Sequence, residues 1–188
     1  MSVIGIPNLD QQLEAQLLAG MKDVENLIRT QVEGKYGLAV ETSRHLVDAG
    51  GKRLRPLLTL ISSHFGDPNA KGIIESAVVC ELTHLGTLYH DDVMDEAPLR
   101  RGVDSANSRW GNNVAILTGD YLFAKVSQLL ADLGPEAVRL QAHTFERLVI
   151  GQIMETQGKT AGLSQLEHYL AVDRKSTRLN SSHTDISR

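Results

Sequence analysis

The chain has 188 residues, a formal net charge of −4, and a composition that is 41% hydrophobic, 22% charged and 4% aromatic. This length and balance predict one globular domain with enough apolar residues to form a core. The 19 lysines and arginines are outnumbered by 23 acidic residues, so the composition argues against binding to nucleic acid. Dense alternation of β-branched residues is absent from the sequence, and we therefore expect an all-α fold.

Apolar residues recur at helical intervals along most of the chain. The first helix is expected to begin near Asn8, with Asn8 and Gln11 as its capping pair. The Asp67-Pro68 and Gly134-Pro135 steps predict breaks between helices, because proline cannot continue a helix. The other predicted helices cover residues 36–49, 55–65, 69–96, 113–133 and 136–157.

A basic loop, residues 50–56 with the sequence GGKRLRP, follows the second predicted helix. Its glycines allow the backbone to turn and to approach a ligand closely. Lys52 supplies a compact positive charge, and Arg55 can donate two hydrogen bonds to phosphate oxygens. Taken alone, such a segment is more often a solvated linker. The G-x-x-x-x-G-K-[ST] pattern of nucleotide-binding loops is absent from the sequence, so a nucleotide is not indicated.

An acidic pentad, residues 91–95 with the sequence DDVMD, ends the helix predicted over 69–96. At about 100° per residue, Asp91 and Asp95 lie roughly 20° to either side of His84 on one helix face. Magnesium usually takes one or two carboxylates and completes its shell with water and phosphate oxygens, so this pair suits a magnesium-bound diphosphate. Acidic residues at a helix end are, however, often only solvated. Arg100 and Arg101 follow shortly after the pentad and add positive charge.

Together these motifs make the sequence resemble the trans-isoprenyl (polyprenyl) diphosphate synthases. The basic loop is similar to a conserved loop of that family, residues 88–95 to its first aspartate-rich motif, and residues 118–122 (TGDYL) to a further signature. The resemblance covers roughly residues 10 to 172. It implies the helical bundle of the isoprenoid synthases, in truncated form.

The resemblance also implies a role for each residue that matches a family motif. Asp91 and Asp95 would hold Mg²⁺ on an allylic prenyl diphosphate, Asp92 would support them, and Arg100 would contact the same diphosphate. Four further residues would bind isopentenyl diphosphate: Lys52, Arg55, His84 and Arg101. The implied reaction is ionisation of the allylic diphosphate, attack by the double bond of isopentenyl diphosphate, and loss of a proton. Adjacent Arg100 and Arg101 point apart in a regular backbone and could serve two anions.

Product length is suggested by the residues one turn before the pentad. In short-chain members of the family, bulky aromatic residues near these positions form the floor of the product pocket, whereas this chain has Gly86 and Thr87. We therefore expect an open pocket and a long-chain product, hexaprenyl to decaprenyl, of the kind that becomes a quinone side chain.

After Val172 the sequence departs from the family pattern. Residues 173–188 contain only Leu179 and Ile186 as sizeable apolar residues, and we expect a disordered or non-native tail after a synthase portion at 1–172. A second aspartate-rich motif is absent from the sequence. The chain is therefore interpreted as an inactive fragment of an enzyme that is a homodimer when full length. A class I terpene cyclase, or a non-catalytic partner subunit of a complete synthase, are the alternatives.

Two expectations concern the surroundings of the protein. The first 20 residues lack the features of a signal peptide, and we expect no apolar run of membrane-spanning length, hence a cytoplasmic protein without stable membrane insertion. Cys80 is the single cysteine, so it forms no internal disulfide, and its place on an apolar helix predicts burial.

Overall fold

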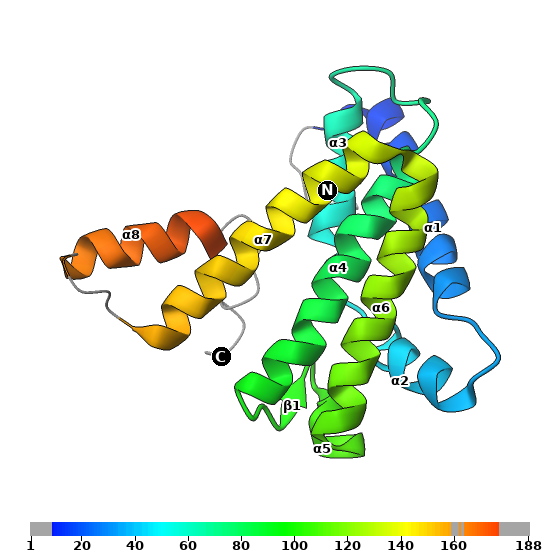
Figure 1. The fold of residues 1–188 in the computed structure, drawn as a ribbon. Coiled ribbons are helices and arrows are strands. Elements are labelled where there is room, and N and C mark those ends of the chain that lie inside the picture. The colour runs from blue at the N-terminus through cyan, green and yellow to red at the C-terminus, as the bar shows by residue number, and fades with distance from the viewer. Residues whose placement is uncertain (1–8, 159–161, 163, 177–188) are drawn as a thin grey trace. The chain divides into compact units, whose positions relative to one another are not determined.

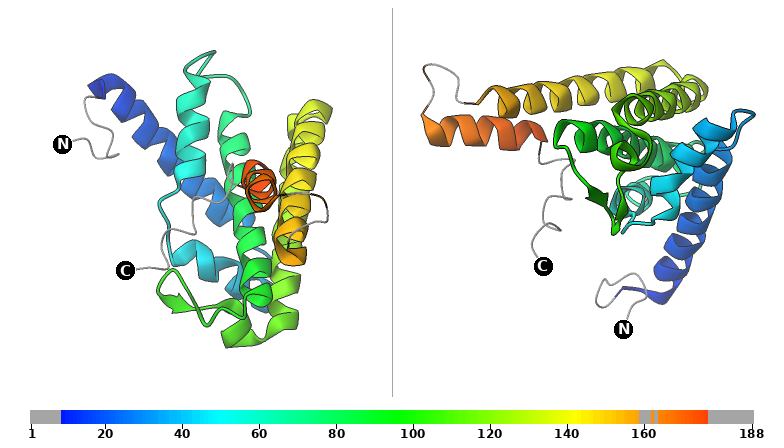
Figure 2. Two further views of the ribbon diagram at one scale, coloured as in Figure 1. Left: turned by 90° about the vertical axis from the view of Figure 1, so that its left-hand side faces the viewer. Right: turned by 90° about the horizontal axis from the view of Figure 1, so that it is seen from below.

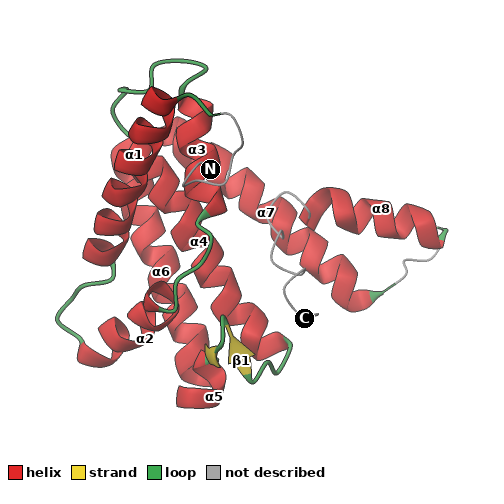
Figure 3. Cartoon of the chain, turned by 180° about the vertical axis from the view of Figure 1, so that it is seen from behind, coloured by secondary structure: helices red, strands yellow, loops and turns green. Residues whose placement is uncertain are grey.

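The computed structural model describes residues 9–158, residue 162 and residues 164–176. Within them the chain is helical apart from loops and one short hairpin, which confirms the all-α prediction (Figures 1 and 3). The chain divides into two compact units, residues 1–133 and residues 134–188.

The first unit contains six of the helices that the structure describes and a two-stranded antiparallel hairpin (Figure 2). Their bounds are α1 Gln11–Gln31, α2 Gly37–Asp48, α3 Leu54–Ser63, α4 Ile73–Met94, β1 Leu99–Arg100, β2 Val103–Asp104, α5 Ala106–Trp110 and α6 Asn112–Leu133. The second unit contains α7 Pro135–Gln157 and α8 Gln165–Ser176, which pack against each other.

Helix α1 begins later than predicted and has a different cap. Asp10 is the N-cap residue, and its Oδ1 accepts hydrogen bonds from the backbone N–H groups of Gln12 at 3.0 Å and Leu13 at 3.1 Å. A capping carboxylate satisfies donors that the first helical turn leaves open. The prediction that Gln11 belongs to a capping pair is therefore wrong, because Gln11 is the first residue of α1 and Asp10 caps the helix. Asn8, the other member of the predicted pair, lies outside the described residues.

Helix α4 is the centre of the first unit, and it packs against α1, α3, α5 and α6. A helix that is apolar on most sides is stable only when neighbours cover it. Its fully buried side chains include Val78, Leu82, Leu85 and Tyr89. The Tyr89 hydroxyl donates to the Thr42 carbonyl at 2.5 Å and so ties α4 to α2. The prediction of a buried helix ending in the acidic pentad is confirmed.

Gly86 has a packing role between two helices, which was not predicted from the sequence. A Cβ at Gly86 would lie 2.9 Å from the Phe123 ring and 3.3 Å from the Gly119 carbonyl oxygen. Gly86 is therefore the point at which α4 approaches α6 closely. Thr87 is half-buried, and its hydroxyl donates to the His84 carbonyl at 2.8 Å.

Helix α6 corrects the expectation about membrane-spanning length. Its 22 residues, Asn112–Leu133, are long and apolar enough to cross a membrane by length and composition. However, α6 buries Ala115, Leu122 and Val126 completely or almost completely, and it packs along α4. An apolar helix with a covered face is typical of the core of a helical bundle.

The hairpin, α5 and α8 were not predicted from the sequence. Strands of two residues are too short to show the alternation that identifies a strand. Helix α8 continues through Ser176, so the expected disorder after residue 172 is wrong for residues 173–176. Residues 177–188 lie outside the described part of the chain.

Candidate functional site

The basic loop connects α2 to α3 in a backbone conformation that favours glycine. Gly50 and Gly51 have φ angles of 81° and 149°, and Arg53 has a φ of 47° as it enters α3. Left-handed conformations cost little for glycine, whereas a bulky residue adopts them only when contacts hold it. Lys52 is exposed on this loop, while Arg53 is only 7% exposed.

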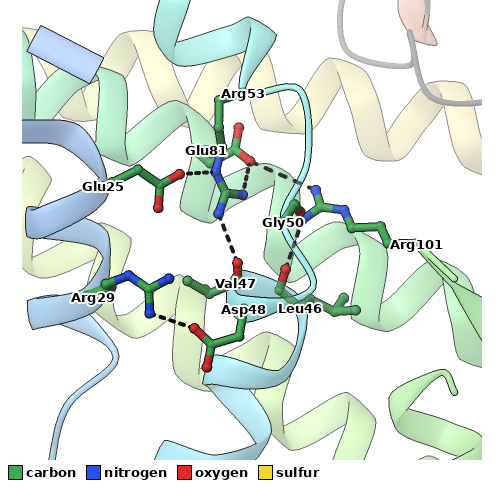
Figure 4. Close-up of polar contacts among 9 residues, drawn as sticks. All are labelled: Glu25, Arg29, Leu46, Val47, Asp48, Gly50, Arg53, Glu81 and Arg101. Atoms are coloured by element: carbon green, nitrogen blue, oxygen red, sulfur yellow. Dashed lines mark hydrogen bonds and ion pairs between the residues drawn. The ribbon is translucent and has the colours of Figure 1, made fainter. Parts of the chain in front are cut away.

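Arg53 is bound by acceptors of the protein itself (Figure 4). Its Nε donates to Glu25 at 2.5 Å, its Nη1 to Glu81 at 2.8 Å, and its Nη2 to the Val47 carbonyl at 3.1 Å. Burial would lower the pKa of Arg53, but Glu25 and Glu81 outweigh it and raise that pKa. Arg53 therefore links α1, α2 and α4, a role that sequence reasoning missed.

Arg55 lies two residues further on and, unlike Arg53, has guanidinium donors without acceptors among the described residues. Its Nε and Nη2 atoms are buried and have no hydrogen-bond partner in the part of the chain that the structure describes. Burial lowers the pKa of Arg55, with nearby Glu81 acting against it. A guanidinium stays protonated in proteins, so two buried donors of a full charge have no acceptor here.

Arg101 reaches the basic loop from the hairpin. The strand register pairs Leu99 with Asp104, so Arg101 and Gly102 form the turn, with φ angles of 53° and 78°. Positive φ at both central residues is typical of a type I′ turn. Arg101 Nη1 donates to the carbonyls of Leu46, at 2.9 Å, and Gly50. Arg101 Nη2 also forms an ion pair with Glu81 Oε1, at 3.9 Å (drawn as a dashed line in Figure 4).

Arg100 and Arg101 diverge, as the sequence predicted, although Arg101 is in a turn and not in a regular strand. Arg100 binds Asp92 through Nε at 2.6 Å and Nη2 at 2.5 Å. Asp92 is completely buried, and its Oδ2 has no hydrogen-bond partner in the described residues. Burial raises the pKa of Asp92, and Arg100 opposes that shift.

His84 lies where the loop and the hairpin converge on α4. It is 6% exposed, and its pKa is lowered to about 3, first by burial and then by the charges of Arg55, Arg101 and Arg100. The imidazole is therefore neutral at physiological pH and can donate one N–H. The structure thus brings Arg55, His84 and Arg101 together, with Lys52 on the adjoining loop.

The acidic pentad forms the C-terminal end of α4. Asp91 is half-buried, and Asp95 is the exposed C-cap residue, whose N–H donates to the Asp91 carbonyl at 2.8 Å. The described residues contain no group of three or more His, Cys, Asp or Glu that could enclose a metal ion. Two carboxylates supply part of an octahedral oxygen shell, which fits a magnesium ion that keeps water and takes phosphate oxygens.

A cleft of about 1000 Å³ lies elsewhere, between α2, the hairpin and α5. Its lining includes Lys35, Arg44, His45, Asp48, Arg109 and Trp110, but not Arg55, His84 or Asp91. Arg109 pairs with Glu41 at 3.3 Å and Arg44 with Asp48 at 3.5 Å, so much of its positive charge is already neutralised. Size alone therefore does not make this cleft the anion site.

Cys80 is exposed, so the prediction that it is buried is wrong. It lies one helical turn before His84, on the α4 face that also carries Thr87 and Asp91. Its Sγ is 4.0 Å from the Thr59 hydroxyl. The candidate face of α4 is thus open at its N-terminal part and buried at His84.

The fold and the site define a class of protein: an all-helical protein of the isoprenoid synthase type, with cationic groups around a central helix that ends in aspartates. The chain belongs to the polyprenyl synthetase family, whose sequence pattern matches residues 38–183. The match therefore extends past residue 172.

Several known proteins are similar to this chain. It is 48% identical to a nonaprenyl diphosphate synthase of Mycobacterium tuberculosis over 93% of this chain and 52% of that protein. It is 38% identical to heptaprenyl diphosphate synthase component 2 of Geobacillus stearothermophilus, over 83% of this chain and 49% of that protein. The chain spans about half the length of the curated relatives that it matches.

Solved structures give the same result. A decaprenyl diphosphate synthase from Rhodobacter capsulatus matches with a TM-score of 0.80 and 34% identity, over 88% of this chain and 51% of that one. A geranylgeranyl pyrophosphate synthase from Corynebacterium glutamicum, complexed with calcium and isoprenyl diphosphate, matches with a TM-score of 0.78 and 45% identity, over 89% and 51%. These relatives favour a prenyl diphosphate synthase over a class I terpene cyclase.

Proposed function

We propose that this chain carries the isopentenyl diphosphate site and the first magnesium-binding carboxylates of a long-chain polyprenyl diphosphate synthase. The observation that carries the proposal is Arg55, because two of its buried donors, near the neutral His84, have no acceptor among the described residues. Diphosphate oxygens would satisfy those donors and offset the repulsion among the surrounding cations. The reaction would join isopentenyl diphosphate to an allylic prenyl diphosphate and give an all-trans polyprenyl diphosphate, a quinone side-chain precursor.

Each residue has a role in this proposal. Lys52, Arg55 and Arg101 bind the diphosphate of isopentenyl diphosphate, and neutral His84 donates a hydrogen bond to it. Arg100 contacts the allylic diphosphate, on the side of the acidic pentad. Asp91 and Asp95 would hold Mg²⁺, which supplies charge stabilisation to the departing diphosphate when bound. Holding both substrates face to face accounts for much of the expected acceleration.

A long-chain product is proposed from the similarity to the nonaprenyl and decaprenyl synthases. Gly86 no longer supports it, because that glycine packs against α6. We infer that the 188-residue chain alone has little turnover, and that the complete enzyme is a soluble, cytoplasmic homodimer. A partner-subunit function is the second candidate, because one relative is named as a component of a heptaprenyl synthase.

The proposal is tested by calorimetric titration of isopentenyl diphosphate into the purified chain. We expect saturable binding, and Arg55→Ala should weaken it by about tenfold or more, since hydrogen bonds to charged groups contribute about 1.5–3 kcal/mol. Arg44→Ala is the matched control, because Arg44 is an exposed arginine that pairs with Asp48. Equal losses in both variants, or no binding by the unaltered chain, would contradict the proposed site.

A further inference from the structure

Two arginines of the basic loop, Arg53 and Arg55, differ in their hydrogen bonds. Every nitrogen of the Arg53 guanidinium donates to a protein acceptor, whereas two buried donors of Arg55 have no acceptor in the described part of the chain. These bonds use three of the five N–H groups of the guanidinium, and Arg53 is only 7% exposed, so little of it is open to a ligand. Arg53 therefore belongs to the structure that holds the loop and is not itself an anion ligand.

Glu81 is the acceptor that connects Arg53 with the rest of the site. It is 2% exposed, binds Arg53 Nη1 at 2.8 Å, and lies 3.9 Å from Arg101 Nη2. Figure 4 shows the Glu81 carboxylate between these two guanidinium groups, one from the loop and one from the hairpin. Its charge also favours the protonated form of Arg55.

Arg101 is in turn packed against the loop backbone. It donates to the Gly50 carbonyl, and a Cβ at Gly51 would lie only 3.0 Å from its Cζ. A change in the position of Arg101 therefore requires a change in the loop. Arg53 has a left-handed φ of 47°, a conformation that persists only while contacts hold it. Loss of the Arg53 contacts would therefore also change the loop.

We propose that the Arg53–Glu81 ion pair is a positioning device for the isopentenyl diphosphate site, which sets the conformation of loop 50–55 and the direction of Arg101. This inference rests on the proposed function of Lys52, Arg55, His84 and Arg101. In this proposal neither Arg53 nor Glu81 contacts the substrate.

The sign of the effect separates positioning from simple charge. If only net charge mattered, Glu81→Gln would make the site more positive and strengthen diphosphate binding, while Arg53→Gln would weaken it. If the pair positions the loop, both variants weaken binding, because each breaks the same contact. The double variant should then bind the diphosphate no more weakly than the single variant with the lower affinity, since the effects of coupled groups are not additive.

The experiment is a double-mutant cycle with the full chain, read by calorimetric titration of isopentenyl diphosphate. We expect each single variant to raise the dissociation constant by about tenfold, because each loses a hydrogen bond between charged groups. Arg53→Lys, which keeps the charge but not the forked geometry, should retain only part of the affinity. Tighter binding by Glu81→Gln, or additive losses in the double variant, would overturn the proposal.

Asp48→Asn is the control, because it breaks the neighbouring exposed Arg29–Asp48 pair and leaves Arg53 untouched. It should bind like the unaltered chain. Amide hydrogen exchange of residues 50–55 is the second readout, and it needs no ligand. Faster exchange in Arg53→Lys and Glu81→Gln, but not in Asp48→Asn, is expected even if the unaltered chain fails to bind isopentenyl diphosphate. That binding failure would contradict the proposed function, whereas unchanged exchange would contradict the positioning role.

Discussion

Gly119→Ala should lower the free energy of unfolding of the first unit by about 1–3 kcal/mol, the usual cost of overpacking a core. A Cβ at this position would lie 2.4 Å from His90 Nε2 and 3.0 Å from the Gly86 carbonyl oxygen. The His90 ring cannot move away freely, because it contacts the Ile116 carbonyl at 3.1 Å and Asp120 at 3.4 Å. The Gly86 carbonyl belongs to the backbone of α4, so relief requires α4 and α6 to separate.

The change is measured by denaturant unfolding, with fluorescence from the single tryptophan, Trp110, which lies in the first unit. Gly37→Ala is the matched control, because a Cβ there would meet nothing within 4 Å. It should be neutral or slightly stabilising, since alanine costs less conformational entropy than glycine. Equal stability of Gly119→Ala and the unaltered chain would mean that the α4–α6 contact is looser than described.

His84 should make the first unit less stable in acid. Its pKa falls from 6.5 to about 3 in the folded chain, so the unfolded chain binds the proton more readily. A lowered folded pKa contributes stability that is complete above pH 6.5 and is lost as the pH falls toward 3. Between these limits the loss approaches about 1.4 kcal/mol per pH unit.

The contribution of His84 is isolated by comparing the unfolding free energies of the unaltered chain and His84→Gln at several pH values. Groups that titrate equally in both chains cancel, so the difference between them should change with pH only below about 6.5. His143→Gln, at an exposed position in the second unit, is the control for replacing a histidine elsewhere in the chain. A difference that is constant with pH would contradict the description of a buried histidine among arginines.

Most of what the sequence could predict about the site came from the helical phase of α4, that is, from which residues share one face of the helix. A period of 3.6 residues puts His84 on the same face as Asp91, and the structure has both on that face. The packing role of Gly86 was not predicted, and the expectation that Cys80 is buried was wrong. Helical phase identifies the residues that share a face, but the packing partner of that face comes from distant segments, here Gly119 and Phe123 of α6.

The different uses of Arg53 and Arg55 could not be read from the sequence. Both are arginines of one basic loop, and local pattern gives no reason to separate them. The distinction depends on Glu25 and Glu81, each 28 residues away from Arg53 along the chain. A buried glutamate on an apolar helix was the available signal, because a buried charge requires a partner.

The central claim is that Arg55, His84 and Arg101 form one diphosphate site, and a structure of the chain with isopentenyl diphosphate and magnesium tests it most directly. We predict diphosphate oxygens within hydrogen-bond distance of Arg55 Nε and Nη2, the two buried donors for which the described residues offer no acceptor. Diphosphate bound instead in the cleft lined by Arg44, Arg109 and Trp110, with Arg55 unchanged, would contradict it.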